Sequence, residues 1–321
     1  MPRLACLAAC LLLLASSLPL AAATQWGRPM MVGPGETYVS LADAARAARP
    51  GTTVRLTPGI YRECAVWTAH HLTIQAEPNT ARVEGPLCEG RAQFILRGND
   101  ITIDGVDFAG ARGTDATAAA VRIEGRSATV RRATFRANSR GVLAVPRAGS
   151  IVRIENTSFE GGAPGPAPVQ VEALGIARLS IDAAHFLAPQ GGVAVRSAAR
   201  TTEITSSTIE DGSAASRLLV EIAGANAVVR GNRFRKSMAR PGAATAAIIL
   251  TAPRDAQPGQ QVFIVNNSIR NDTAASLTFV RNLGPAPAQV MGNVFSGAPV
   301  TEVEGAAAPF VIPPPERKMP P

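Results

Sequence analysis

The feature that most constrains the fold of this chain is an apolar repeat with a period of about 25 residues. Each copy has Ile or Val at its first position and Phe or Ile five residues later, as in Ile103 and Phe108. A unit of this size cannot bury its apolar face alone, whereas stacked units can, so the repeat predicts a solenoid. The copies begin at Ile103, Val130, Ile154, Ile181, Ile204, Val229, Ile264 and Val290.

The content of each repeat narrows the class of solenoid. Between successive copies lies another short β-rich stretch, such as Val142-Leu143-Ala144-Val145, and turn residues separate the two. Leucine-rich repeats would need an L-x-x-L-x-L run with helical segments, and a β-propeller would need about four strands in a period of 40 or more. We therefore expect an all-β chain folded as a parallel β-helix.

The ends of the repeat array differ from its middle. Residues 38–49 carry apolar side chains at helical spacing and are followed by Pro50-Gly51, which predicts a short helix that caps the first coil. Residues 306–321 are rich in proline, and we expect them to form a disordered tail. The β-helix domain is therefore predicted to span residues 24–305.

The first 23 residues have the layout of a secretory signal peptide. An arginine precedes a long apolar stretch, and the small residues Ala21-Ala22-Ala23 place the cleavage site before Thr24. No second stretch is long and apolar enough to span a bilayer. We expect a protein that is exported to the periplasm or the cell exterior and has no membrane span after this segment is removed.

Two cysteines, Cys64 and Cys88, remain after that removal. In an exported chain a lone pair 24 residues apart favours one structural disulfide. Two buried free thiols are the alternative.

The charge of the chain first suggests nucleic acid as a partner, because the net charge is +8. The arginines are nevertheless spread through every repeat, basic runs are absent, and only 4% of residues are aromatic. Nucleic acid is therefore not expected.

The sequence also offers few metal ligands. It has only three histidines, and Asp100, Asp104 and Asp107 lack the spacing of a calcium loop. We predict no metal and no cofactor.

Three motifs resemble those of secreted bacterial right-handed parallel β-helix proteins of the pectate-lyase-like superfamily. They are Pro50-Gly-Thr-Thr-Val-Arg-Leu-Thr-Pro-Gly-Ile-Tyr61, the coil Ile154-x-Asn156-x-x-Phe159 and Val265-Asn-Asn-Ser268. The resemblance covers about residues 36–300 and implies a right-handed coil. It also implies an acidic, uronate-type polysaccharide as the first ligand to consider, since active members cleave or epimerise such chains. Fold alone does not fix the activity.

A row of charged residues follows the second β-rich stretch of the repeats. We expect its members to stack on one outer face, about 4.8 Å apart. Three arginines in succession, Arg97, Arg122 and Arg147, would repel one another unless Glu124 and other acids or an anionic ligand compensate. We predict that these three and Glu172 bind an acidic polysaccharide. The row comprises Arg97, Arg122, Arg147, Glu172, Arg196, Glu221, Thr251 and Arg281.

Catalysis would need a base beside the uronate carboxylate and a cation to stabilise the resulting anion. Arg196 and Glu221, one coil apart, are the best candidates. Arginine is hard to deprotonate, and the His-Asn pair expected of active relatives is missing. The sequence therefore favours polysaccharide recognition with lost or altered catalysis. An active uronan lyase or epimerase and a structural or protein-interaction solenoid are the alternatives.

Overall fold

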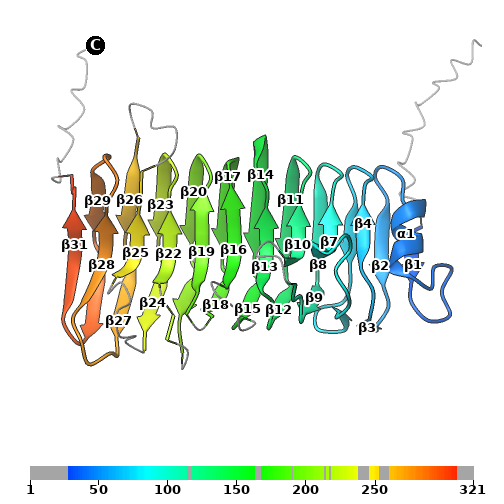
Figure 1. Ribbon diagram of the computed structural model, residues 1–321, viewed down its shortest axis with the longest axis horizontal. Helices are drawn as coiled ribbons and strands as arrows, with labels where there is room; N and C mark the ends of the chain where they lie inside the picture. The colour runs from blue at the N-terminus through cyan, green and yellow to red at the C-terminus, as the bar shows by residue number, and fades with distance from the viewer. Residues whose placement is uncertain are drawn as a thin grey trace, which may run out of the picture.

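A computed structural model describes residues 28–308 apart from 114–117, 163–167, 190, 213–214, 217, 238–245 and 253–259. The predicted signal peptide, residues 1–23, lies outside this part of the chain, as do residues 309–321. The described residues form three long parallel sheets, here called A, B and C, and one short helix. Figure 1 shows the strands stacked side by side from the helix at one end to β31 at the other.

Each coil of the stack contributes one strand to each sheet in the order A, B, C. Sheet A consists of β1 (Met30–Val32), β2 (Thr53–Leu56), β5 (Thr73–Gln75), β8 (Ile101–Asp104), β11 (Ser127–Arg131), β14 (Arg147–Glu155), β17 (Ile176–Asp182), β20 (Thr201–Thr205), β23 (Asn226–Arg230), β26 (Val262–Val265) and β29 (Ala288–Met291). Sheet B consists of β3 (Gly59–Tyr61), β6 (Ala81–Val83), β9 (Val106–Ala109), β12 (Thr134–Arg136), β15 (Ser158–Glu160), β18 (His185–Leu187), β21 (Thr208–Glu210), β24 (Arg233–Lys236), β27 (Ser268–Asn271) and β30 (Val294–Gly297). Sheet C consists of β4 (Ala65–Trp67), β7 (Ala92–Leu96), β10 (Ala119–Ile123), β13 (Arg140–Ala144), β16 (Val169–Leu174), β19 (Val193–Ala198), β22 (Leu218–Ile222), β25 (Ala246–Leu250), β28 (Leu277–Asn282) and β31 (Val300–Gly305).

The apolar repeat of the sequence forms the inward faces of sheets A and B. Ile103 pairs with Val130 in sheet A, and the register continues through every copy to Val290. The second positions, from Phe108 to Phe295, pair in the same way in sheet B. The prediction of a parallel β-helix is confirmed, because each repeat is one coil.

Aromatic side chains fill the middle of the core. The rings of Phe108, Phe135, Phe159 and Phe186 stack along the solenoid axis with centroids 4.7–5.2 Å apart. This spacing matches the separation of neighbouring strands, so one Phe in each coil packs on the next without a gap. The few aromatic residues of the chain are therefore concentrated where stacking stabilises adjacent coils.

The turn from sheet A to sheet B uses one residue in the left-handed backbone conformation in each of the eight repeated coils. The next residue points into the core, and in the last three coils it is Asn232, Asn267 or Asn293. The side chain of Asn267 accepts a hydrogen bond from the Asn232 backbone N–H, and Asn293 repeats this with Asn267, so the amides form a ladder between coils. The left-handed positions are Gly105, Arg132, Asn156, Ala183, Ser206, Gly231, Asn266 and Gly292.

Replacing Ala183 by Gly is expected to raise the free energy of unfolding by about 1 kcal/mol. Ala183 has φ 50°, where a Cβ atom is strained and glycine is not. Urea unfolding would measure the change, and Ala184→Gly at the next, buried position should lower stability instead. Equal effects of both substitutions would contradict this interpretation of the turn.

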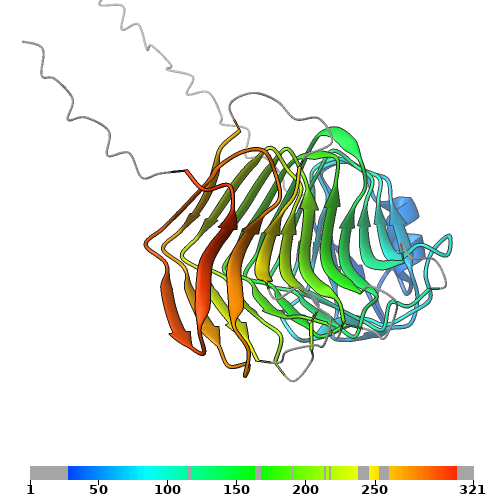
Figure 2. The same ribbon diagram turned by 60° about the vertical axis from the view of Figure 1, so that its left-hand side comes forward.

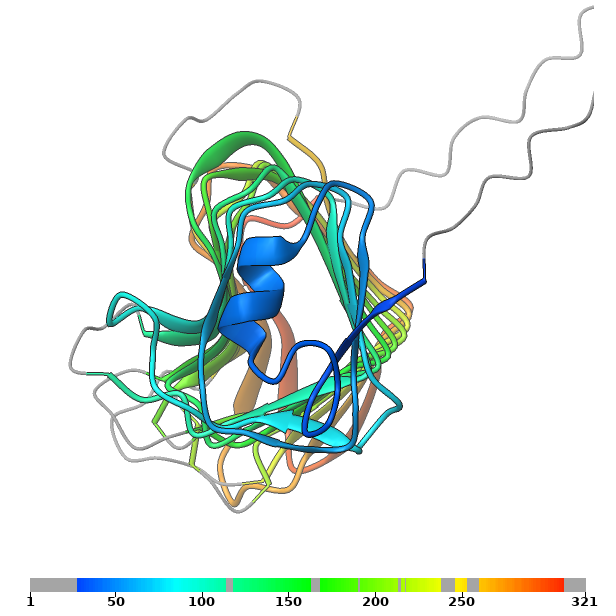
Figure 3. The same ribbon diagram turned by 90° about the vertical axis from the view of Figure 1, so that its right-hand side faces the viewer.

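The N-terminal end of the solenoid is covered by helix α1 (Leu41–Ala47), within the predicted 38–49. Ser40 caps it by accepting a hydrogen bond from the Asp43 N–H at 3.0 Å. Leu41, Ala44 and Ala45 are buried against the first coil. Figure 3 shows the helix lying across the open end of the coil, as the sequence predicts.

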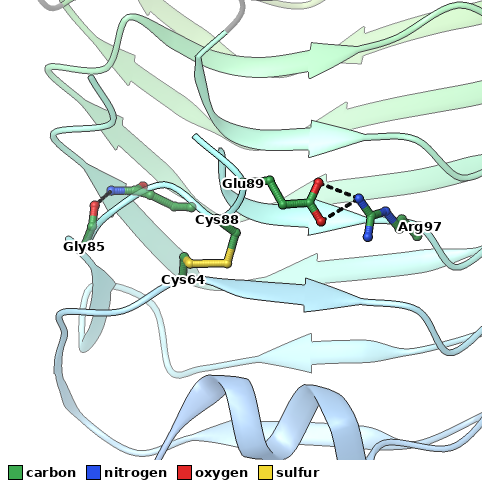
Figure 4. Close-up of a disulfide and its surroundings, with 6 residues drawn as sticks. Cys64, Gly85, Cys88, Glu89 and Arg97 are labelled. Carbon is green, nitrogen blue, oxygen red and sulfur yellow. Dashed lines mark hydrogen bonds and ion pairs between the residues drawn. A yellow bond between two sulfur atoms is a disulfide. The ribbon is translucent and has the colours of Figure 1, made fainter. Parts of the chain in front are cut away.

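The predicted disulfide between Cys64 and Cys88 is confirmed. Their sulfur atoms are bonded at 2.07 Å, and their Cα atoms are 5.4 Å apart. Cys64 directly precedes β4 and Cys88 lies shortly before β7, so the bridge joins two neighbouring coils beside sheet C (Figure 4).

Candidate functional site

The outer face of sheet C carries a row of charged and apolar side chains. The predicted row shares five members with it but is wrong at three positions. Arg97 follows the end of β7, Arg147 begins β14 in sheet A, and Thr251 follows β25. In the structure the row is Ile95, Arg122, Leu143, Glu172, Arg196, Glu221, Ile249 and Arg281.

The error has a structural cause in the segments that connect sheet B to sheet C. The chain needs 14 residues to pass from Phe108 to Arg122 but only eight to pass from Phe135 to Leu143. A constant spacing of 25 residues therefore selects Arg147, although Leu143 is the residue that aligns with Arg122. The run of three adjacent like charges does not exist in this sheet.

The three predicted arginines nevertheless meet, because all of them contact Glu124. The carboxylate of Glu124 accepts hydrogen bonds from Arg122 Nε at 2.7 Å and Arg97 Nε at 3.0 Å. Arg147 Nη1 donates to the backbone carbonyl of Glu124 at 3.0 Å. The alternative in which Glu124 offsets the arginine charge is thus the one that the structure shows.

A loop held by the disulfide completes this group. The Arg97 guanidinium also donates to Glu89, with an Nη2–Oε2 distance of 2.6 Å (Figure 4). Arg91 Nη1 lies 3.7 Å from Glu89 and 3.8 Å from Glu124. We call these six residues the Glu124 cluster: Glu89, Arg91, Arg97, Arg122, Glu124 and Arg147.

The Glu124 cluster is unbalanced in charge, with four guanidinium groups and two carboxylates. Burial alone would raise the pKa of Glu124, but hydrogen bonds from Arg122 and Arg97 outweigh it and lower that pKa below 4.5. Glu124 therefore stays ionised at neutral pH. The cluster keeps an excess of two positive charges, and Arg91 is half exposed to solvent.

A second group lies further along the same face. Arg140 Nε donates to Glu172 Oε2 at 2.5 Å, and Arg196 bridges Glu172 at 3.2 Å and Glu221 at 2.9 Å. We call Arg140, Glu172, Arg196 and Glu221 the Glu172 cluster. Glu172 is buried and its side chain is 8% exposed, so its two arginine partners offset most of its desolvation.

The predicted catalytic pair, Arg196 and Glu221, is brought together in this second cluster. Burial would lower the pKa of Arg196, but hydrogen bonds and charge attraction with Glu221 and Glu172 outweigh it and raise that pKa above its ordinary value. A guanidinium held in this way keeps its proton at neutral pH. The geometry therefore suits charge stabilisation or carboxylate binding rather than removal of a proton by Arg196.

The sequence did not indicate three members of these clusters, Glu89, Arg91 and Arg140. Glu89 directly follows Cys88, so the predicted disulfide was the signal that could have brought it beside sheet C. Arg140 aligns with Val169 rather than with the charged row, and its side chain reaches Glu172 from the next strand. Its place depends on the short connection from β12 to β13, which no repeat pattern indicates.

A second row of charged residues lies on the outer face of sheet A. Asp104 pairs with Arg131 and Glu155 follows on the next strand. Asp104 is buried and binds both Arg131 and Arg132. Two arginines therefore offset the charge of this buried carboxylate.

Among the described residues no group of three or more His, Cys, Asp and Glu side chains is arranged to hold a metal ion. No helix in this part of the chain has both the length and the apolar character needed to cross a membrane.

Comparison with known proteins gives similarity to solved structures alone. No protein-family model and no curated protein matches the chain. A pectin methylesterase from Aspergillus niger is 11% identical with a TM-score of 0.49, over 87% of this chain and 91% of that one. The pectin methylesterase of Erwinia chrysanthemi is 11% identical with a TM-score of 0.44, over 83% and 92% of the two chains. A PL6 family alginate lyase is 14% identical with a TM-score of 0.44, over 83% of this chain and 38% of that one.

These identities and scores concern the general fold and carry no activity over to this chain. The three parallel sheets, the register of the repeats and the helical cap establish the same architecture directly. The chain is a right-handed parallel β-helix.

Proposed function

We propose that this protein binds an acidic, uronate-type polysaccharide at the Glu124 cluster and along the adjoining outer face of sheet C. The observation that carries the proposal is the excess of two positive charges where four arginines surround two carboxylates. Sugar carboxylates are planar anions that a guanidinium can bind with two parallel hydrogen bonds. The similar solved structures include pectin methylesterases and an alginate lyase, which agrees with this ligand class.

Arg91 and Arg147 are the residues best placed to meet such a ligand. Arg91 is 48% exposed and lies 3.7 Å or more from its nearest carboxylates, which is longer than a hydrogen bond. Arg147 is exposed and spends one donor on a backbone carbonyl. Both guanidinium groups therefore keep donors that a bound carboxylate can accept.

In this proposal Arg196 binds or stabilises negative charge and does not remove a proton. Catalysis of the lyase type is therefore proposed to be lost or altered. The raised pKa of Arg196, caused by Glu221 and Glu172 against the effect of burial, supports this view. Incubation with polygalacturonate or alginate should give no rise in ultraviolet absorbance from unsaturated product. A clear rise would favour the alternative of a working lyase.

Binding can be tested by titrating the protein with polygalacturonate and alginate, with dextran as the uncharged polymer. Arg91→Gln with Arg147→Gln should weaken uronan binding at least tenfold, because both guanidinium groups that can bind a sugar carboxylate are removed. A tenfold change corresponds to roughly 1.4 kcal/mol of binding free energy. The matched control is Arg153→Gln with Arg178→Gln, which removes the same charge from the outer face of sheet A. The control variant should bind like the parent protein.

Two results would contradict the proposal. Equal weakening in both double variants would show that net charge alone attracts the polymer. Absence of binding to every uronan on a glycan array would favour a structural or protein-interaction solenoid.

A further inference from the structure

A hollow lies at the corner where sheet A passes into sheet B, towards the C-terminal end of the solenoid. Figure 2 shows the turns of successive coils one behind another along this edge. The hollow has a volume of about 460 Å³. Sheet C forms the third side of each coil, so the hollow and the Glu124 cluster lie on different sides of the molecule. The lining of the hollow includes Ser206, Gly231, Arg233, Asn266, Ser268 and Val294.

The left-handed turn residues determine the shape of the hollow. In four successive coils they are Ser206, Gly231, Asn266 and Gly292. A Cβ atom at Gly231 would meet no atom within 4 Å, so this glycine leaves open space between Ser206 and Asn266. A Cβ atom at Gly292 would instead lie 2.3 Å from Asn266 Oδ1, because the Asn266 side chain leans towards Gly292 and away from Gly231. Two coil spacings, about 9.6 Å, separate Ser206 from Asn266, which leaves room for one sugar ring.

Polar groups in the hollow keep their hydrogen-bonding capacity. In the described part of the chain, the Arg233 guanidinium, the Asn266 amide and the Ser268 hydroxyl have no hydrogen-bond partner. The register of sheet B pairs Arg233 with Ser268 and Ser268 with Val294, so these three side chains lie side by side on β24, β27 and β30. Val294 is 66% exposed. The hollow therefore combines an unpaired cation, polar groups and an exposed apolar side chain.

We propose that the hollow binds one acidic sugar unit, with the sugar carboxylate on Arg233. A guanidinium binds a planar carboxylate with two parallel hydrogen bonds. Asn266 and Ser268 offer donors and acceptors that suit sugar hydroxyl groups, and Val294 offers an apolar surface to the C–H groups of the ring. The ligand class is that of the proposed function, on which this inference rests. The two sites share no residue, so each can be tested separately.

Calorimetric titration with trigalacturonate counts the sites, because so short a chain cannot reach both sides of the molecule. The parent protein should bind two molecules of this ligand per chain. Arg233→Gln should weaken one of the two binding events at least tenfold and leave the other unchanged. The matched control is Arg235→Gln, which removes the same charge from the same strand, β24, at a residue that is already paired with Asp272. This control should bind like the parent protein, and equal weakening by both substitutions would overturn the proposal.

Filling the hollow gives a second test that leaves Arg233 in place. Asparagine already occupies the same turn position at Asn156 and Asn266, so the backbone accepts Gly231→Asn without new strain. This variant should lose the binding event that Arg233→Gln weakens, at an unchanged midpoint of urea unfolding. The control is Gly51→Asn, at a left-handed glycine with open space beside it in the loop after helix α1. It should keep both binding events.

The same titrations distinguish this proposal from the proposed function. A single binding event that is lost in Arg91→Gln with Arg147→Gln but unchanged in Arg233→Gln would overturn the hollow as a site and leave the proposed function in place. A single event that is lost in Arg233→Gln but unchanged in the Arg91 and Arg147 double variant would support the hollow and contradict the proposed function. Absence of binding to the parent protein would overturn both.

Discussion

Replacing Lys236 by Met is expected to lower the free energy of unfolding by about 3–5 kcal/mol, since one partner of a buried ion pair is lost. Lys236 Nζ donates at 2.7 Å to Asp211 Oδ2, to the Ser216 carbonyl and to Ser216 Oγ. Asp211 and Ser216 are fully buried, and the Lys236 side chain is 5% exposed. Without Lys236, the carboxylate of Asp211 would stay buried without its cation.

The neighbouring residue Arg235 provides the control on the same strand. Its guanidinium binds Asp272 at 2.7 Å on the outer face and is half exposed, so Arg235→Gln should cost less than about 1 kcal/mol. Denaturant unfolding of both variants measures the difference. A second variant, Lys236→Met with Asp211→Asn, should recover part of the loss, because no unpaired charge is left. Similar small losses of unfolding free energy for Lys236→Met and Arg235→Gln would show that the buried ion pair does not stabilise the fold.

The location of this pair links it to the candidate site. Asp211 follows β21, Lys236 ends β24, and Ser216 lies two residues before β22. The three residues therefore fix the passage from sheet B to sheet C just ahead of the strand that carries Glu221. We expect the Lys236→Met protein to lose order at the Glu172 cluster before the solenoid as a whole unfolds.

Removal of the disulfide by Cys64→Ser with Cys88→Ser is expected to lower the free energy of unfolding by about 3 kcal/mol. The bridge closes a loop across 24 residues of sequence, and opening it returns conformational freedom to the unfolded chain. The loop also presents Glu89 and Arg91, so uronan binding should weaken together with stability.

A reductant separates the disulfide from the effect of the serines. Reduced parent protein should unfold at the same denaturant concentration as the double variant, and the double variant should not respond to the reductant. A parent protein whose unfolding is unchanged after complete reduction would contradict the prediction. Mass spectrometry after alkylation checks that reduction is complete.

The register of two sheets could be predicted from the sequence because the connection from sheet A to sheet B has constant length. Each of the eight repeated coils passes from its Ile or Val to its Phe or Ile in five residues, through one left-handed turn. The chain pattern and the spatial pattern therefore coincide, from Ile103 and Phe108 onwards. Asp104 and Arg131 pair in the same register, for the same reason.

The outer face of sheet C could be predicted only in part. The spacing identified Arg122, Glu172, Arg196 and Glu221 as one row. The last three are 24 and 25 residues apart, and the two unequal steps from Arg122 through Leu143 to Glu172 add up to two repeats. It failed at Arg97 and Arg147, where the connections and strand lengths change. Their contacts with Glu124 depend on side chains that reach between strands, which a periodic pattern cannot show.

The sequence by itself determined the coil, the disulfide partners and the helical cap, because each depends on local spacing that repeats or on the pairing of two unique cysteines. Tertiary structure alone decided which charges meet. Arginine side chains are long, and the connections between sheets B and C vary, so Arg97, Arg122 and Arg147 surround Glu124 from three different coil positions. The tertiary structure likewise decided the burial of Lys236, because its ammonium group binds Asp211 and Ser216 in the connection from β21 to β22.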